Sequence, residues 1–509
     1  MPNIYRGNVK RMSNVLEIIT SSKLTYEQKV HSLAHAAEDS LSIISIPEKT
    51  KYYFDIQAID DLYEGHAPYR PRYIMPDYEK FIKNGSQFLR ISPPSDLDEL
   101  LNSMMILYKH VPSITGFPVY LGSIDKLIEP FLGGVSDEAA KKKLRLFLDF
   151  LDRTITDSFC HANIGPEPTR AGKLILELEK ELQNAVPNFT LKYDSDITPD
   201  DFAELAIYTS LFCANPAICN HKLHLKTYSC DYGISSCYNI LPIGGGAYTL
   251  SRLTLPGLAK IATNVEQFLN ELLPDCLQAL ANYMNERVNF LVEKSGFFES
   301  SFLVKEGLIH PDNFIGMFGI TGLAECVNLL MGDSGKRYGH DVGADNLADK
   351  IMEIITDFLA EFPARYSKIS NGHFMLHAQV GMDYDKGITS GVRIPVGDEP
   401  ENIYDHLRHS ARFHKHITTG CGDIFPFETT GRNNPSAILD IVKGAFSLGS
   451  KYISFYEQNS DLVRITGYLV KRSEMEKYKN EQVVLQNTTH LGASNYDSNR
   501  LKDRKVRGL

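Results

Sequence analysis

The sequence predicts an α/β fold, and three observations carry that prediction. From about residue 115 onwards, short apolar stretches of strand type alternate with amphipathic stretches of helical spacing. This alternation continues over more than 300 residues, which is typical of a mostly parallel sheet with helical crossovers. No internal repeat or low-complexity linker divides the chain. At this length, we therefore expect a closed barrel rather than an open sheet.

The elements can be placed in order along the chain. Apolar residues at helical spacing predict a helical hairpin within residues 12–45, broken at Ser21-Ser22-Lys23, and a further helix over residues 97–109. An amphipathic helix is predicted at 258–273 and continues after Pro274. The basic segment 500–507 is predicted to be a solvated tail, with a docking role as the alternative. Strands are predicted at 117–121, 159–164, 189–193, 247–255, 314–320, 373–380 and 452–456.

Composition and charge limit the classes of partner. A net charge of −10 argues against nucleic acid or an anionic membrane as the main partner. The first residues contain no apolar run of the signal-peptide kind, and no run of about 18 apolar residues occurs anywhere. We therefore expect a cytoplasmic protein.

The cysteines are spaced too widely for a cluster. No Cys-x-x-Cys pair occurs, so zinc-ribbon and ferredoxin-type sites are disfavoured and no bound metal is expected. In a long chain without a disulfide framework, all eight are predicted to be reduced thiols. They are Cys160, Cys213, Cys219, Cys230, Cys237, Cys276, Cys326 and Cys421.

Two segments suggest radical chemistry. The first is Arg464-Ile-Thr-Gly-Tyr-Leu-Val470; a glycine beside a tyrosine is also typical of a turn or bulge at the end of a strand. Glycine can store a radical because loss of one α-hydrogen leaves a planar centre that no Cβ crowds. Such a store is useful only beside a thiol, whose S–H bond is close in strength to the glycyl Cα–H bond. Cys237, in a Gly- and Ser-rich stretch over residues 228–256, has the required character.

These segments resemble the glycyl-radical loop and the cysteine finger loop of anaerobic (class III) ribonucleotide reductases. Cys237 then falls on the thiyl-radical cysteine and Gly467 on the radical glycine. Residues 117–131 and 316–325 resemble further segments of these enzymes in the expected order, so the resemblance covers roughly residues 115–509. The segments 159–165 and 187–193 are more similar still to the YjjI family of glycyl radical enzymes, and the chain is identified as a member.

The resemblance implies a ten-stranded β/α barrel of glycyl radical enzyme type. Residues 1–114 would form an N-terminal helical cap, 115–445 the barrel with the cysteine finger loop, and 446–509 the glycyl radical segment. A separate radical-SAM activating enzyme with an iron–sulfur cluster would install the radical on Gly467, so no cofactor would be bound to this chain itself. The radical would pass to Cys237, whose thiyl abstracts hydrogen from a small-molecule substrate. The resemblance also implies a homodimer.

The chain departs from each well-understood member of this group. Residues 454–463 contain no cysteine, so the zinc site of class III reductases is absent. Ser236 stands where pyruvate formate-lyases have a second cysteine, which disfavours acyl transfer. Asn239 replaces the glutamate of the Cys-x-Glu motif of glycyl radical dehydratases. A ribose-like or polyol substrate, undergoing dehydration or reduction, is the remaining expectation.

Four further residues are candidates for binding the substrate. His161 and Asn163, two apart on one predicted strand, point to the same face and could hold a hydroxyl group or simply pair within the core. Glu325, at the start of a helix, could act as a base or complement the helix dipole. Glu428 is an acid candidate of similar standing.

Other functions stay open at the level of sequence. If turnover is reductive, a second thiol must supply an electron, and Cys160 or Cys230 is the candidate. The chain could also be a catalytically silent barrel that serves as a binding or regulatory subunit. A metal-dependent hydrolase using His414 and His416 is a further alternative.

Overall fold

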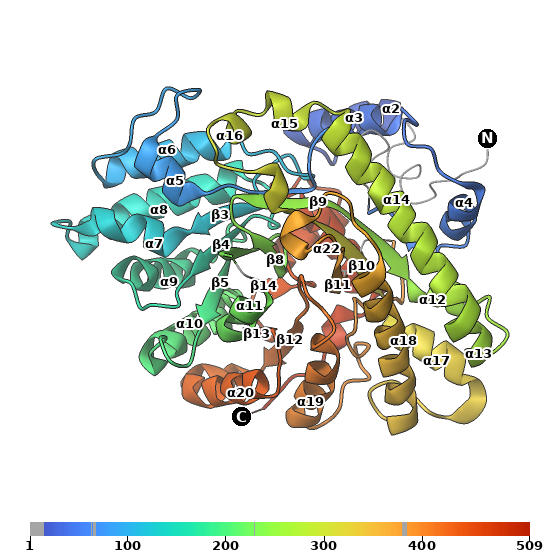
Figure 1. The fold of residues 1–509 in the computed structure, drawn as a ribbon. Helices are drawn as coiled ribbons and strands as arrows, with labels where there is room; N and C mark the ends of the chain where they lie inside the picture. The colour runs from blue at the N-terminus through green and yellow to red at the C-terminus, as the bar shows by residue number, and fades with distance from the viewer. Residues whose placement is uncertain (1–14, 63, 65–67, 229, 379–383, 509) are drawn as a thin grey trace.

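Two β-sheets form the centre of the fold (Figure 1). The computed structural model describes residues 15–62, 64, 68–228, 230–378 and 384–508. One sheet has six strands in the order β12-β13-β6-β5-β4-β3, and the other has five, in the order β1-β9-β10-β11 with β2 also paired to β9. Their bounds, with those of two hairpins, are β1 (Ile59–Asp60), β2 (Tyr73–Met75), β3 (Tyr120–Ser123), β4 (His161–Ile164), β5 (Asn188–Tyr193), β6 (Ala217–Asn220), β7 (Tyr232–Ser235), β8 (Asn239–Pro242), β9 (Gly245–Thr254), β10 (Phe314–Thr321), β11 (Met375–Ala378), β12 (Asp423–Phe427), β13 (Tyr452–Glu457), β14 (Leu462–Arg464) and β15 (Leu469–Lys471).

The sheets are mostly parallel, as the alternation of strands and helices predicts. Strands β3 to β6 run parallel, β12 and β13 run parallel, and the two groups join through an antiparallel pairing of β13 with β6. Strands β9, β10 and β11 are also parallel, whereas β1 and β2 add to β9 in the antiparallel sense. The α/β prediction is therefore confirmed.

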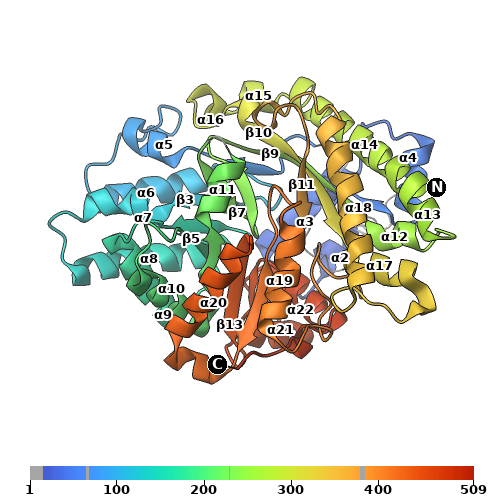
Figure 2. The same ribbon diagram turned by 60° about the horizontal axis from the view of Figure 1, so that its bottom comes forward.

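Helices cover the outer faces of both sheets (Figures 1 and 2). Two crossover helices of the six-stranded sheet begin with a side-chain cap: Ser136 accepts from the Ala139 amide and Thr169 from the Gly172 amide. The helices are α2 (Val15–Thr20), α3 (Tyr26–Asp39), α4 (Glu48–Asp55), α5 (Tyr78–Asn84), α6 (Leu97–Tyr108), α7 (Ile124–Ile128), α8 (Asp137–Thr154), α9 (Arg170–Leu182), α10 (Asp200–Cys213), α11 (His221–Thr227), α12 (Leu255–Ala259), α13 (Val265–Gln267), α14 (Leu273–Glu293), α15 (Phe297–Ser300), α16 (Phe302–Lys305), α17 (Leu323–Met331), α18 (Val342–Glu361), α19 (Ile403–His414), α20 (Pro435–Ser447), α21 (Arg472–Lys479) and α22 (Thr488–Ser498).

The structure refines the sequence prediction in four places. The helix predicted at 258–273 is interrupted after α12, because Asn264 caps a new helix by accepting from the Gln267 amide; Pro274 lies in the first turn of α14 and does not break it. The N-terminal region is helical but also supplies β1 and β2 to the five-stranded sheet. The strand predicted at 373–380 is β11, and its last two residues lie outside the described part of the chain. Within the described residues, hydrogen bonding leaves the two sheets separate and does not close a ten-stranded barrel.

Two hairpins, β7–β8 and β14–β15, lie at the centre of the molecule (Figure 1). The first spans the gap between the sheets. Its strand β7 bonds to Asn163 on β4, and Tyr238 at its tip donates to the Ala378 carbonyl on β11, 3.1 Å away. Hydrogen bonds from both sheets therefore hold the β7–β8 hairpin in place.

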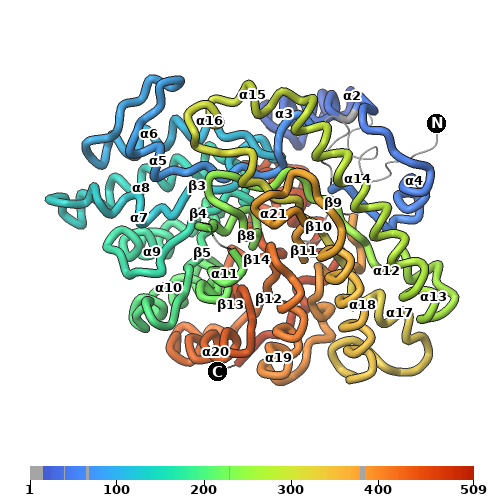
Figure 3. Tube along the Cα trace, viewed as in Figure 1, coloured from blue at the N-terminus to red at the C-terminus, as the bar shows by residue number. Residues whose placement is uncertain are grey.

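A segment near the start of the described chain meets a segment near its end over one side of this centre. Gln28 of α3 donates to the Val484 carbonyl at 3.2 Å, and Lys23 pairs with Glu481 at 2.7 Å. The trace then returns past the centre and ends beside α20 (Figure 3). In the part of the chain that is described, no helix combines the length and apolar character needed to cross a membrane.

Candidate active site

Cys237 occupies the tip of the β7–β8 hairpin. Ser235 and Asn239 form the last cross-strand pair, which leaves a three-residue turn. Ser236 takes a positive φ of 58° to make this turn, and Cys237 beside it is only 2% exposed. Asn163 fixes the hairpin from outside, since its amide donates to the Ile234 carbonyl at 2.9 Å and accepts from the Ile234 amide at 2.8 Å.

Gly467 lies in the four-residue turn between β14 and β15. The turn closes with a bond of 3.0 Å from the Ile465 amide to the Tyr468 carbonyl, and all four of its residues are buried. Asn188 of β5 donates to the Gly467 carbonyl at 3.2 Å, so a side chain of the six-stranded sheet holds this glycine in place.

The two turns touch at Cys237 and Gly467. A Cβ built on Gly467 would lie 2.2 Å from Cβ, 2.9 Å from Cα and 3.0 Å from Sγ of Cys237. These separations are far below van der Waals contact, so no side chain fits at this position unless the cysteine moves. The predicted approach of the cysteine and the glycine is therefore present, although they are far apart in the sequence.

Two buried arginines hold the glycine turn. Arg464 donates from Nε to the Ala214 carbonyl at 2.9 Å. Arg504, from the end of the chain, donates to the carbonyls of Arg464 and Ile465. Arg504 and Arg507 are 8% and 5% exposed, so the prediction of a solvated tail is wrong for these two residues, because their guanidinium groups donate to backbone carbonyls.

Burial sets the protonation of the groups around the contact. It raises the pKa of Cys237 well above that of an ordinary thiol, so the sulfur keeps its hydrogen at neutral pH. His161 is fully buried beside the backbones of Gly467 and Ser236, and burial followed by the charge of Arg464 lowers its pKa. The imidazole is therefore neutral and lies between the two turns.

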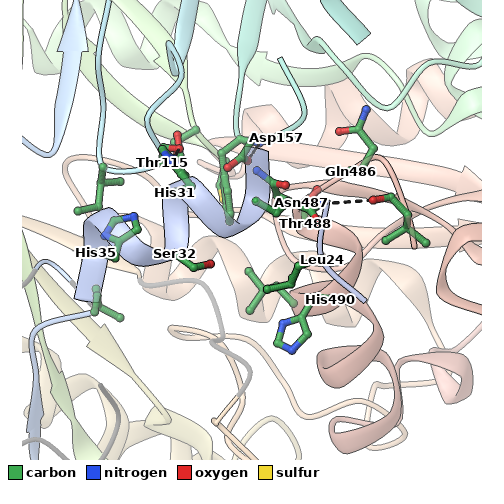
Figure 4. Close-up of a pocket in the computed structure, with 18 of the residues that line it drawn as sticks. Leu24, His31, Ser32, His35, Thr115, Asp157, Gln486, Asn487, Thr488 and His490 are labelled. Carbon is green, nitrogen blue, oxygen red and sulfur yellow. Dashed lines mark hydrogen bonds between the residues drawn. The ribbon is translucent and has the colours of Figure 1, made fainter. Parts of the chain in front are cut away.

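A cavity of about 420 Å³ opens beside Cys237. Helix α3, with His31 and Ser32, lines it on one side, and the segment around residues 478–491, with Asn487 and His490, lines it on the other (Figure 4). Asp157 also lines it, and burial raises the pKa of this carboxyl to about 7. The volume suits a small ligand.

Three polar residues of this cavity were missed by sequence reasoning: Asp157, Arg72 and His377. Asp157 precedes a predicted strand and His377 lies on one, but neither belongs to a motif, and Arg72 lies in a segment without clear periodicity. Burial and, to a smaller extent, the charge of Arg72 lower the pKa of His377 to about 3, so His377 is neutral. Only the tertiary arrangement reveals these groups.

The four predicted substrate residues fall in different places. His161 contacts the two turns, and the side-chain amide of Asn163 is hydrogen-bonded to the β7–β8 hairpin. Both residues therefore position Cys237, and neither lines the cavity. Glu325 is half-buried and accepts from the Thr389 hydroxyl beside a second cavity of about 170 Å³, and desolvation raises its pKa. Glu428 is exposed. Neither Glu325 nor Glu428 lines the cavity beside Cys237, and their assignment as substrate residues stays a prediction.

The other predicted thiols and imidazoles are also away from the cavity. Cys160 is 1% exposed within the main apolar core, Cys230 is half-buried, and neither lines the cavity. His414 and His416 turn to different carboxylates, those of Asp423 and Asp349. The hydrolase alternative therefore lacks the paired imidazoles on which it depends.

The comparisons with known proteins agree with this geometry. The family model described as "Glycyl radical enzyme YjjI-like" matches residues 24–507. An uncharacterized protein of Haemophilus influenzae is 42% identical over 504 residues, which cover 97% of this chain and 98% of that protein.

Two solved structures share the fold at low sequence identity. The anaerobic ribonucleotide reductase from Thermotoga maritima in complex with dATP and CTP matches with a TM-score of 0.66 and 13% identity, covering 94% of this chain and 90% of that one. Hydroxyproline dehydratase from Clostridioides difficile, with trans-4-hydroxy-L-proline bound, matches with a TM-score of 0.63 and 11% identity, covering 98% and 89%. The architecture is thus that of glycyl radical enzyme barrels.

Proposed function

The chain belongs to the YjjI-like family of glycyl radical enzymes, and from that premise we propose that Gly467 stores the radical and Cys237 delivers it to a substrate. Enzymes of this kind carry a glycyl radical that an activating enzyme generates. The observation that carries the assignment to these two residues is the contact between their turns.

The surroundings of both residues support a hydrogen-atom relay. A relay needs near contact and a sulfur that holds hydrogen rather than charge, and burial raises the pKa of Cys237 in that direction. The Gly467 turn is buried, so bulk water is kept from the carbon that would carry the radical. Cys237 also lines the cavity, so the thiyl would face a bound substrate directly.

The remaining features of the proposal concern the partner and the reaction. We infer that the activating enzyme is a radical-SAM protein with an iron–sulfur cluster, and that the present chain works as a cytoplasmic homodimer. The substrate would be a small ribose-like or polyol molecule that undergoes dehydration or reduction. A cavity of about 420 Å³ with several polar side chains supports a substrate of that size.

Oxygen cleavage after activation tests the radical site. Anaerobically activated protein should show a glycyl electron spin resonance signal, and exposure to air should break the chain at Gly467 and release a fragment that begins near Tyr468. Gly467→Ala should show neither the signal nor the break. Cys237→Ser should keep both, because this residue relays the radical and does not store it.

The outcome that would refute the assignment is equally specific. An intact chain after activation and aeration, with a spin signal that persists in Gly467→Ala, would place the radical on another residue. Unactivated wild-type protein, treated with air in the same way, is the control and should stay whole.

A further inference from the structure

The cavity beside Cys237 contains one carboxyl group whose position suits proton transfer. This inference rests on the radical function proposed above. We propose that Asp157 exchanges protons with the substrate of Cys237, that this substrate is a small uncharged vicinal diol or polyol, and that the reaction is loss of water.

Asp157 is held so that one oxygen is available to a ligand. Its Oδ1 accepts from the Phe159 amide at 2.9 Å, which fixes the carboxyl in a side chain that is only 6% exposed. Among the described residues only this amide bonds the carboxyl, so Oδ2 is left to the cavity that Cys237 also lines. The charge of Asp157 also contributes to the raised pKa of Cys237, which shows that the two groups lie within electrostatic reach of each other.

The protonation of Asp157 suits both halves of a proton exchange. Burial raises its pKa to about 7, so the acid and the carboxylate are both populated near neutral pH. A group in that condition can give a proton to a leaving hydroxyl and take one from a neighbouring hydroxyl. An ordinary exposed aspartate, ionised at this pH, could perform only the second of these steps.

The charges of the cavity favour an uncharged substrate. Arg72 pairs with Glu64 at 3.0 Å and Lys23 pairs with Glu481 at 2.7 Å, so within the described lining each lysine or arginine already has a carboxylate partner. A phosphate or carboxylate on the substrate would have to compete with Glu64 and Glu481 for these cations.

The polar atoms that remain match hydroxyl groups. Arg72 Nε, Asn239 Oδ1 and His377 Nδ1 are buried and have no hydrogen-bond partner among the described residues. They provide a donor, an acceptor and a nitrogen that can serve in either role. Hydroxyl groups both donate and accept, so a small polyol could satisfy all three.

The cysteines of the cavity favour dehydration over reduction. A reduction consumes electrons from outside, and of the eight cysteines only Cys237 lines the described cavity. Loss of water needs no external electron. The Cys237 thiyl takes hydrogen from a hydroxyl-bearing carbon, so an S–H bond forms as a C–H bond breaks.

The neighbouring C–O bond then breaks, and its hydroxyl leaves as water with a proton from Asp157. The retained hydroxyl returns a proton to Asp157 and becomes a carbonyl. The carbon radical that remains takes hydrogen back from the Cys237 thiol, which restores the thiyl. The sum is one diol converted to one aldehyde or ketone and one water, with both residues unchanged.

The test uses activated full-length protein and three defined diols. After anaerobic activation, the reductant is removed by gel filtration, and the protein is incubated with ethane-1,2-diol, propane-1,2-diol or glycerol. Carbonyl products are trapped as hydrazones and identified by mass. We expect a product that lacks one water, formed without added reductant.

Two variants separate Asp157 from a general effect of buried acids. Asp157→Asn should lower the rate at least about 100-fold while the glycyl spin signal stays at full strength, because the acid–base group is lost but the radical is not. Glu179→Gln is the matched control: it also replaces a buried carboxyl of raised pKa, but one on α9 that lines neither described cavity, and it should react at nearly the wild-type rate.

Several results would overturn the inference. They are an Asp157→Asn variant that keeps its rate, a reaction that requires formate or a dithiol, and a fully radical-bearing wild-type protein that leaves all three diols unchanged. Absence of the spin signal from wild-type protein would instead refute the proposed radical function, and this inference with it. The two failures are therefore distinguishable.

Discussion

Replacing Gly467 by alanine tests the central contact without any need for the radical. The new Cβ would lie 2.2 Å from the Cβ of Cys237, and the backbone of Gly467 is outside the left-handed region, so the cost is steric and not conformational. Overpacking of a buried site typically costs about 1–3 kcal/mol. We expect Gly467→Ala to lower the free energy of unfolding by about that amount in the unactivated protein.

A double-mutant cycle assigns this cost to Cys237. Cys237→Gly removes both the Cβ and the Sγ that crowd the new methyl group, so the double variant should recover at least about 0.5 kcal/mol relative to additivity. Cys237→Ala keeps the Cβ and should recover less. The chain has no tryptophan, so urea unfolding is followed by far-ultraviolet circular dichroism.

A glycine without neighbours provides the control. Gly444 lies in α20, and a Cβ built there meets nothing within 4 Å. Gly444→Ala should raise the free energy of unfolding by about 0.4–1 kcal/mol, since alanine loses less backbone freedom on folding. A Gly467→Ala variant as stable as wild type, or one whose cost simply adds to that of Cys237→Gly, would show that the two turns do not touch.

Three further outcomes follow from the same site. Arg504→Ala should leave two buried carbonyls of the glycine turn unpaired, at about 1–3 kcal/mol each, and should therefore make that turn more sensitive to limited proteolysis; unchanged cleavage would argue against the clamp. Asp157 has a folded-state pKa of about 7, above its unfolded value, so its stabilising effect is complete below that unfolded value and is lost as the pH rises through about 7. The urea midpoint of Asp157→Asn should accordingly fall less than that of wild type between pH 5 and pH 8, and parallel profiles would contradict this. Cys160→Ser and Cys230→Ser should both keep diol dehydration in the hydrazone assay, because neither thiol lines the cavity; loss of turnover in either, with the spin signal intact, would indicate a reductive reaction.

The secondary-structure elements and single motifs of this protein can be predicted from the sequence, because each depends on residues that are close together in the chain. Strand and helix periods predict the α/β class, and seven predicted strands correspond to strands of the two sheets. Four strands of the two sheets were not predicted, β1, β2, β6 and β12; each has five residues or fewer, and so short a stretch carries little periodicity. Gly467 and Cys237 could be identified because each can carry a radical and lies in a segment that resembles a loop of known radical enzymes.

The sequence by itself therefore determined the fold class, the family and the two residues proposed for the radical. The tertiary structure alone decided which groups share the cavity with Cys237: it brings Asp157, Arg72 and His377 there and leaves Glu325 and Glu428 elsewhere. The physical reason is that period and composition describe which way a side chain points from its own element. They do not describe the order in which strands pair or where a hairpin lies between two sheets, and those arrangements set the distances between residues far apart in the chain.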